Sequence, residues 1–388
     1  MHRSKIFIVL ALILVLSLSV AGLSACKQAA ATEEETTAQA TSSETVAEET
    51  TAAETTAAET AASETIAAKD LTVGINLYFI SPFTSSMVRG AEAAGKDYGI
   101  KIDVAASENA DTMQQIGLFE GQISKGVKAI VVFCVDAQSW VVPINEAVDN
   151  GAIVLGSNSG VRDSKQSAFV GISGYTDGLL LGEEIKKLAE LEGKTGKVVL
   201  GNCVPGLPVL ENRVKGLLES LADKPEWEIV GPLDSGLTPD ATYAFWENAY
   251  NANPDMIMAI GSCSLDLPAL YKLKLKYPDA KFVTIGYDLE PDALKGIQEG
   301  SHAITLGQHP YLQGYLPVMA IAEHLVNGNP LAQGWIDSGK EVITKANVDE
   351  VMERETNPEV ENTWYKDYIE KNFKPIWEKA VSWDKFID

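Results

Sequence analysis

Polar and aromatic side chains follow most of the apolar, strand-like runs in this sequence of 388 residues, directly after the run or early in the next helix-like stretch. Carboxylate, amide and guanidinium groups form paired hydrogen bonds with polar molecules, and aromatic rings cover apolar faces. Gathered at one site, such groups would bind a small polar molecule without reacting with it. The candidate ligand-binding residues are Tyr78, Phe79, Phe83, Asp136, Asn158, Arg213, Ser262, Asp288 and Gln308.

Each candidate also has a structural interpretation. Asp136 and Asp288 precede helix-like segments, where a carboxylate can accept hydrogen bonds from the first free backbone N–H groups. Arg213 lies in an amphipathic stretch, where a solvated position is the default for arginine. Turn formation would explain Asn158 and Ser262, and closure of the crossover between domains would explain Gln308. The three aromatic residues flank a proline after a buried strand, and at least one of them is expected to face the ligand, without the sequence indicating which. The sequence leaves both interpretations open.

Motifs that would indicate catalysis are missing. Gly193-Lys194-Thr195 resembles the end of a phosphate-binding loop, but Leu188 stands where the first glycine should be, and the tripeptide precedes a strand-like run. The chain has no GxGxxG after a strand, no GxSxG and no HExxH. Its four histidines fit no metal-ligand spacing. The sequence therefore predicts no enzyme, no cofactor and no metal site.

The elements that must position the candidates alternate along the chain. From residue 71 onward, short apolar runs rich in β-branched residues alternate with amphipathic, helix-like stretches. This order predicts an α/β fold of parallel sheets joined by crossovers. About 320 residues are too many for one core and suit two. We therefore expect two doubly wound lobes joined by a hinge, with the carboxyl ends of both sheets, and the ligand, at one cleft.

The two lobes are expected to be discontinuous in sequence. The N-terminal lobe is predicted to comprise residues 70–173 and 309–336, and the C-terminal lobe residues 174–308 and 337–388. The last of these ranges is rich in Trp, Tyr and Phe beyond residue 345. These aromatic residues are expected to pack an additional helix over a lobe, and the alternative is a surface for a partner.

The first residues indicate export. Arg3 and Lys5 precede an apolar run, residues 6–20, that is too short for a comfortable membrane span. Leu23-Ser24-Ala25-Cys26 follows and resembles the bacterial lipoprotein lipobox. Residues 1–26 are therefore predicted to be a lipoprotein signal peptide, with Cys26 carrying the lipid that holds the protein at the membrane surface. An ordinary secretory signal is the alternative.

Residues 27–69 consist almost entirely of Ala, Thr, Glu and Ser. They contain too few apolar side chains to offset the entropy of ordering, so they are predicted to form a disordered tether. The chain as a whole has a formal net charge of -23, which disfavours binding to nucleic acid or to anionic lipid. We expect a monomer that contacts the membrane only through its lipid anchor.

Three cysteines remain once Cys26 is set aside, and an odd number excludes a complete set of disulfides. Cys134, Cys203 and Cys263 each lie at the end of an apolar run, which favours buried packing. Whether Cys203 and Cys263 pair is left open by the sequence.

Three stretches occur in an order typical of one family. They are VGINLYFISPFTSSMVRGAEAA, QISKGVKAIVVFCVDAQSWVVPINEAVDNGAIVLGSN and IGYDLEPDALKGIQEGSHAITLGQHPYLQGY. In order and spacing the chain resembles the type I periplasmic binding proteins of the ribose and galactose group, over roughly residues 70–345. The resemblance implies ligand contacts for Phe83, Asn158, Arg213, Asp288 and Gln308. It also implies an extracytoplasmic, lipid-anchored protein that passes a sugar to the permease of an ABC importer.

Departures from the family pattern bear on specificity. Asn158-Ser159 stands where pentose and hexose binders often have Asp-Arg, Ser262 replaces an Asn or Asp, and Thr84 replaces a second aromatic residue. These differences put in doubt that the ligand is ribose. A nucleoside, a polyol or a signalling molecule is the alternative ligand. A receptor that reports its ligand to a membrane sensor is the alternative role.

Overall fold

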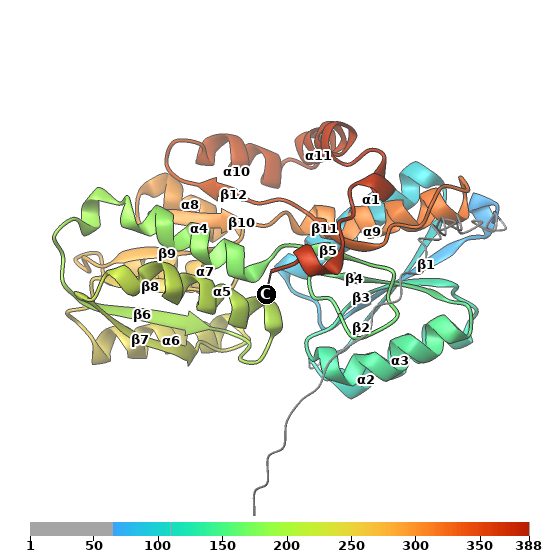
Figure 1. Ribbon diagram of the computed structural model, residues 1–388. Helices are drawn as coiled ribbons and strands as arrows, with labels where there is room; N and C mark the ends of the chain where they lie inside the picture. The colour runs from blue at the N-terminus through green and yellow to red at the C-terminus, as the bar shows by residue number, and fades with distance from the viewer. Residues whose placement is uncertain (1–64, 109, 388) are drawn as a thin grey trace, which may run out of the picture. The chain divides into compact units, whose positions relative to one another are not determined.

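The computed structural model describes residues 65–108 and 110–387 (Figure 1). The expected signal peptide, the lipidation site Cys26 and nearly all of the expected tether lie outside the described residues. Within these two ranges, no helix is both long and apolar enough to span a bilayer.

The first lobe contains a six-stranded sheet of order β11-β5-β4-β3-β1-β2, in which every neighbouring pair is parallel. Apolar runs such as AIVVF form strands whose residues are all buried, as expected for parallel strands covered on both faces. The elements are β1 (Thr72–Leu77), α1 (Pro82–Tyr98), β2 (Lys101–Ala106), α2 (Thr112–Ser124), β3 (Ala129–Phe133), α3 (Ala137–Asp149), β4 (Ile153–Ser157), β5 (Ala168–Gly171), α9 (Pro310–Leu325) and β11 (Gly334–Asp337).

The second lobe contains a sheet of order β12-β10-β9-β8-β6-β7. Its strands are parallel except that the edge strand β12 is antiparallel to β10. The elements are α4 (Gly174–Lys186), β6 (Gly196–Asn202), α5 (Pro208–Ser220), β7 (Trp227–Asp234), α6 (Pro239–Ala252), β8 (Met258–Gly261), α7 (Asp266–Lys276), β9 (Val283–Tyr287), α8 (Pro291–Glu299), β10 (Ile304–Gly307), β12 (Glu341–Ile343) and α10 (Val348–Thr356). The predicted fold class, two lobes built on parallel sheets, is confirmed.

The chain passes between the lobes beside the sheets at residues 172–173, 308–309 and 338–340. The second passage leads directly into α9, which lies against α1. A Cβ atom at Gly90 would lie 1.9 Å from the carbonyl oxygen of Tyr311, and one at Gly314 would lie 1.8 Å from that of Met87. Glycine at these two positions therefore allows the two helices to touch, which fixes the start of α9 next to the strand ends.

The C-terminal region departs from the prediction, which assigned residues 337–388 to the second lobe. Helix α10 does pack there, since Val348 and Val351 share a core with residues of α8. Helix α11 (Pro358–Asn372) instead buries Tyr365 and Ile369 in the core of the first lobe. The chain thus crosses between the lobes a fourth time, near Asn357. The assignment of the tail beyond this residue was wrong because an apolar stripe on a helix does not reveal which core will receive it.

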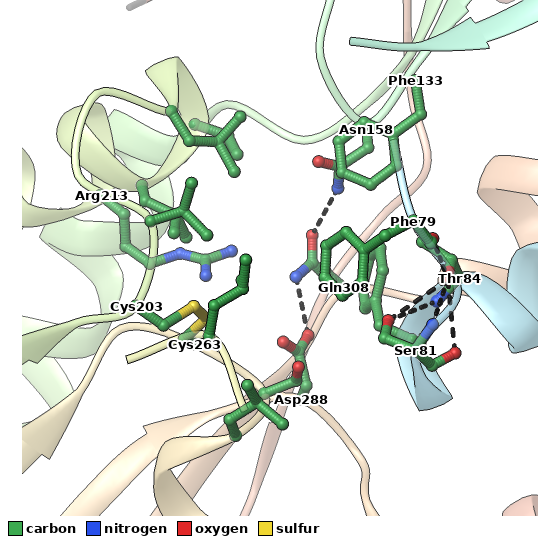
Figure 2. A pocket seen from close by; sticks show the side chains of 18 residues that line it. Phe79, Ser81, Thr84, Phe133, Asn158, Cys203, Arg213, Cys263, Asp288 and Gln308 are labelled. Carbon is green, nitrogen blue, oxygen red and sulfur yellow. Dashed lines mark hydrogen bonds between the residues drawn. A yellow bond between two sulfur atoms is a disulfide. The ribbon is translucent and has the colours of Figure 1, made fainter. Parts of the chain in front are cut away.

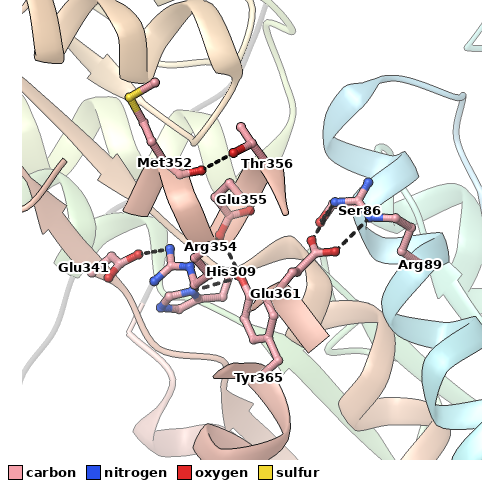
Figure 3. Close-up of polar contacts among 10 residues, drawn as sticks. All are labelled: Ser86, Arg89, His309, Glu341, Met352, Arg354, Glu355, Thr356, Glu361 and Tyr365. Atoms are coloured by element: carbon pink, nitrogen blue, oxygen red, sulfur yellow. Dashed lines mark hydrogen bonds and ion pairs between the residues drawn. The ribbon is translucent and has the colours of Figure 1, made fainter. Parts of the chain in front are cut away.

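Charged side chains surround the fourth crossing (Figure 3). Arg354 of α10 pairs with Glu341 and, through Nε at 2.7 Å, with Glu355. The hydroxyl of Tyr365, on α11, donates a hydrogen bond to Glu355 at 3.3 Å. We call these contacts the crossing cluster. The hydrogen bond from Tyr365 to Glu355 joins the two helices where the chain leaves the second lobe.

Candidate ligand-binding site

A partly open cavity with an empty volume of about 570 Å³ lies between the lobes, where the strand ends of both sheets meet (Figure 2). Three aromatic residues of the first lobe line one side of it. They are Phe79 and Phe83, on either side of the start of α1, and Phe133 at the end of β3. Six of the nine predicted ligand-binding residues line this cavity: Phe79, Phe83, Asn158, Arg213, Asp288 and Gln308.

Three predicted residues do not line it. Asp136 accepts hydrogen bonds from the N–H of Gln138 at 3.1 Å and from the hydroxyl of Ser139, so it caps α3, the structural alternative. Ser262 offers its backbone carbonyl to Arg213 and so acts behind the lining. Tyr78 packs the edge of its ring against Phe79, with centroids 5.6 Å apart. Sequence could not resolve these directions, because consecutive residues after a strand point to different sides.

Arg213 enters the cavity from α5 and is only 1 % exposed. Its Nη1 donates to the carbonyl of Ser262 at 2.6 Å, and its guanidinium lies 3.8 Å from the ring centroid of Tyr287. Nε and Nη2 have no hydrogen-bond partner among the described residues. A buried cation with two unused donors carries a large cost unless something accepts from it. The solvated alternative for Arg213 is therefore excluded.

A chain of amide and carboxylate groups faces Arg213. Gln308 donates through Nε2 to Oδ1 of Asp288 at 2.7 Å, and Asn158 donates to Oε1 of Gln308 at 3.4 Å and of Gln313 at 3.0 Å. Asp288 and Asn158 both adopt left-handed backbone conformations, with φ of 75° and 59°, which Asp and Asn tolerate better than most residues. Asp288 does not cap α8, whose start has no side-chain cap.

Gln313 was missed by the sequence analysis. It is fully buried on α9 and also donates to the backbone carbonyl of Gln308 at 2.9 Å. A signal was present, because Gln313 is a single amide within the otherwise apolar stretch around LQGYLPVMAIA. Buried amides of this kind need partners, so they often hold other polar residues in place.

A disulfide joins Cys203, after β6, to Cys263, after β8, with the Cα atoms 6.0 Å apart. This settles the question that the sequence left open. Cys203 is also buried in a hydrophobic cluster, as predicted, whereas Cys263 is only partly buried beside it. The prediction of buried packing is confirmed for Cys134, which is a buried free cysteine. Both bridged residues line the cavity. Beneath the bridge, Asp266 accepts hydrogen bonds from the N–H of Cys263 at 3.1 Å and from Nε1 of Trp246 at 2.9 Å.

Removing the disulfide by the double substitution Cys203→Ser and Cys263→Ser is expected to lower the free energy of unfolding by about 2 to 4 kcal/mol, because the bridge closes a long loop in the unfolded chain. Ligand affinity should fall as well, since two cavity loops lose their link. Urea denaturation with and without a reductant measures the first effect. The reductant should affect the unsubstituted protein and leave the double variant unchanged; equal stability of the two proteins would contradict a structural bridge.

Two α/β lobes built on parallel sheets, with a lined cavity at the strand ends, define a periplasmic binding protein of type I. Residues 73–330 match the periplasmic binding protein domain family. This chain belongs to that family, in its ribose and xylose group, which comprises non-enzymatic solute-binding proteins.

The chain is also similar to individual sugar-binding proteins of this family. The chain is 25 % identical over 292 residues to the xylose/arabinose-binding protein XylF of Sulfolobus acidocaldarius, covering 71 % of each chain. It is 24 % identical to the ribose import binding protein RbsB of Bacillus subtilis, covering 67 % of this chain and 83 % of that one. An ABC transporter solute-binding protein from Burkholderia graminis, crystallised with D-arabinose, superposes with a TM-score of 0.68 at 24 % identity, covering 72 % and 97 %.

Proposed function

We propose that this chain is a lipid-anchored, extracytoplasmic binding protein that captures a sugar and delivers it to an ABC importer. The observation that carries the proposal is the buried guanidinium of Arg213, which lines the cavity together with Asp288 and has two donors without a partner among the described residues. The names of the relatives support it, since they bind xylose, arabinose or ribose, and one of them serves import.

The polar groups fit the chemistry of a sugar. Neighbouring hydroxyls can both donate and accept, so one edge of a sugar can accept from Arg213 while another hydroxyl donates to Asp288. Asn158 and Gln308 extend this set along the crossover. The rings of Phe79 and Phe83 would cover the C–H face. A ligand that contacts both lobes favours their closed arrangement, which a permease can recognise.

Binding is tested by thermal shift of the full-length chain, purified in mild detergent, against pentoses, hexoses, polyols, nucleosides and amino acids. A ligand that binds only the folded protein raises the unfolding midpoint. A sugar is expected to raise it. Shifts with nucleosides or amino acids, and with no carbohydrate, would show that the sugar assignment is wrong.

The anchor and the delivery step need separate experiments. Cys26→Ser is expected to move the protein from the membrane fraction to the soluble fraction, and retention at the membrane would argue against lipidation at this residue. Deletion of the chain is expected to abolish uptake of the labelled sugar by whole cells. Normal uptake combined with loss of a sugar-induced transcriptional response would instead favour the receptor role.

Ligand affinity is expected to depend on pH through Asp288. Burial raises the pKa of this carboxyl above its ordinary value of 3.8, against the opposing effects of Arg213 and the hydrogen bond from Gln308. A ligand hydroxyl that donates to Asp288 requires the ionised carboxylate. The affinity therefore has its full value above the raised pKa and falls as the pH drops through it. Below that pKa, the affinity decreases about tenfold per pH unit. Calorimetric titrations between about pH 8 and pH 4 measure this profile. Asp288→Asn should bind weakly and with little pH dependence, whereas an unchanged profile would assign the titration to another group.

A further inference from the structure

The second lobe presents a largely apolar surface to the cavity. Four aliphatic side chains, which we call the apolar wall, come from the loops after β6, β7 and β8: Val204, Leu207, Leu237 and Leu265. The Cys203–Cys263 disulfide lies in the same part of the lining. Across the described residues of this lobe, the polar side chains that line the cavity are Arg213, Asp288 and Ser264. Ser264 is partly exposed and so keeps access to water.

The first lobe adds few further partners for a ligand. The hydroxyls of Ser81 and Thr84 also line the cavity, but they are used within the turn that begins α1. Thr84 donates through Oγ1 to the carbonyl of Phe79 at 2.9 Å, and its N–H donates to Oγ of Ser81 at 3.2 Å. The other groups on this side are mostly aromatic carbon. Apart from Ser264, the polar side chains that line the cavity and are not used within this turn form, among the described residues, an arc of Arg213, Asn158, Gln308 and Asp288 (Figure 2).

Building on the sugar-binding role proposed above, we propose that the ligand turns an alkyl group toward the apolar wall, as the methyl group of a 6-deoxyhexose would. A hydroxyl pressed against this wall loses its water and gains no partner, which weakens binding. A methyl group at the same place removes apolar surface from water, which strengthens it. The ligand therefore has hydroxyls where it meets Arg213 and Asp288, and carbon where it meets the apolar wall.

Sugar pairs that differ by one oxygen atom test this inference. D-fucose and D-galactose, L-rhamnose and L-mannose, and 6-deoxy-D-allose and D-allose each exchange a methyl for a hydroxymethyl group. Isothermal titration calorimetry of the full-length chain in mild detergent gives the affinity for both members of each pair, with D-xylose, D-arabinose and D-ribose titrated alongside. In a pair that binds, the deoxy sugar is expected to bind at least about tenfold more tightly.

A matched pair of variants locates the effect on the wall. Leu237→Gln places an amide at the cavity and is expected to reduce the preference for the deoxy sugar several-fold. Leu275→Gln makes the same change on α7 at a side chain that is 63 % exposed and does not line the cavity. It should leave the preference unchanged. An equal response of both variants would show that the wall does not set the preference.

The outcomes separate this inference from the proposed function. Tighter binding of the hydroxymethyl sugars, or binding of pentoses alone, would overturn the alkyl inference while sugar binding stands. Absence of binding by every carbohydrate would overturn both.

Discussion

Replacement of Arg213 by lysine is expected to weaken sugar binding about 100-fold, the loss of roughly one or two hydrogen bonds from a charged donor. Lysine keeps the positive charge, but a single ammonium cannot reproduce the planar fork in which Nη1 donates to Ser262 while Nε and Nη2 remain without a protein partner. The stacking on Tyr287 is also lost. Calorimetric titration with the tightest-binding sugar measures the change in dissociation constant.

The same exchange at Arg89 provides a control. Arg89 is 47 % exposed, pairs with Glu361 at 2.8 Å and does not line the cavity, so Arg89→Lys should leave the affinity unchanged. The free energy of unfolding of both variants should be measured in parallel, because Arg213 also lies close to buried carboxyl groups. Binding by Arg213→Lys within a few-fold of the unsubstituted protein would remove Arg213 from the ligand site.

The largest effect on stability is expected for Tyr365→Ala, at about 3 to 5 kcal/mol in the free energy of unfolding. Tyr365 is fully buried, and its ring stacks on that of Tyr311 with centroids 4.3 Å apart and an angle of 8° between the planes. Truncation leaves a cavity between α11 and α9, and it detaches the tail from the first lobe. Urea denaturation measures the change.

Tyr365→Phe separates packing from polar contact at the same position. It keeps the ring and removes only the hydroxyl that donates to Glu355, so it should cost about 1 kcal/mol. If the alanine and phenylalanine variants were equally stable, the buried stack would not hold the tail in place.

The elements of the fold could be predicted because buried parallel strands leave a strong pattern. Runs such as AIVVF and KVVLGN are typical of buried strands when amphipathic stretches separate them, and they do form strands β3 and β6. The position of the cavity followed from topology, since parallel strands bring their carboxyl ends to one edge of each sheet. Asp288 and Gln308 come directly after β9 and β10, and this is why they were found.

The failures have a common physical origin, which is the direction of individual side chains and the choice of partner across space. Asp136 follows a strand as Asp288 does, yet it turns back to cap the next helix. The disulfide connects cysteines 60 residues apart, and no local pattern encodes that proximity. The stripe on α11 indicates burial but does not reveal which lobe it joins. The apolar wall was missed because leucines in loops are read as ordinary packing.

The fourth passage of the chain near Asn357 changes the mechanics of domain motion. Three short linkers beside the sheets would act as a simple hinge. Helices α10 and α11 add a fourth connection, because α10 packs on the second lobe and α11 packs on the first. A rotation of one lobe against the other would strain the hydrogen bond from Tyr365 to Glu355, which is the contact of the crossing cluster that joins α11 to α10. If ligand binding rotates one lobe against the other, a fluorescent label at position 357 is expected to change its emission when a sugar is added.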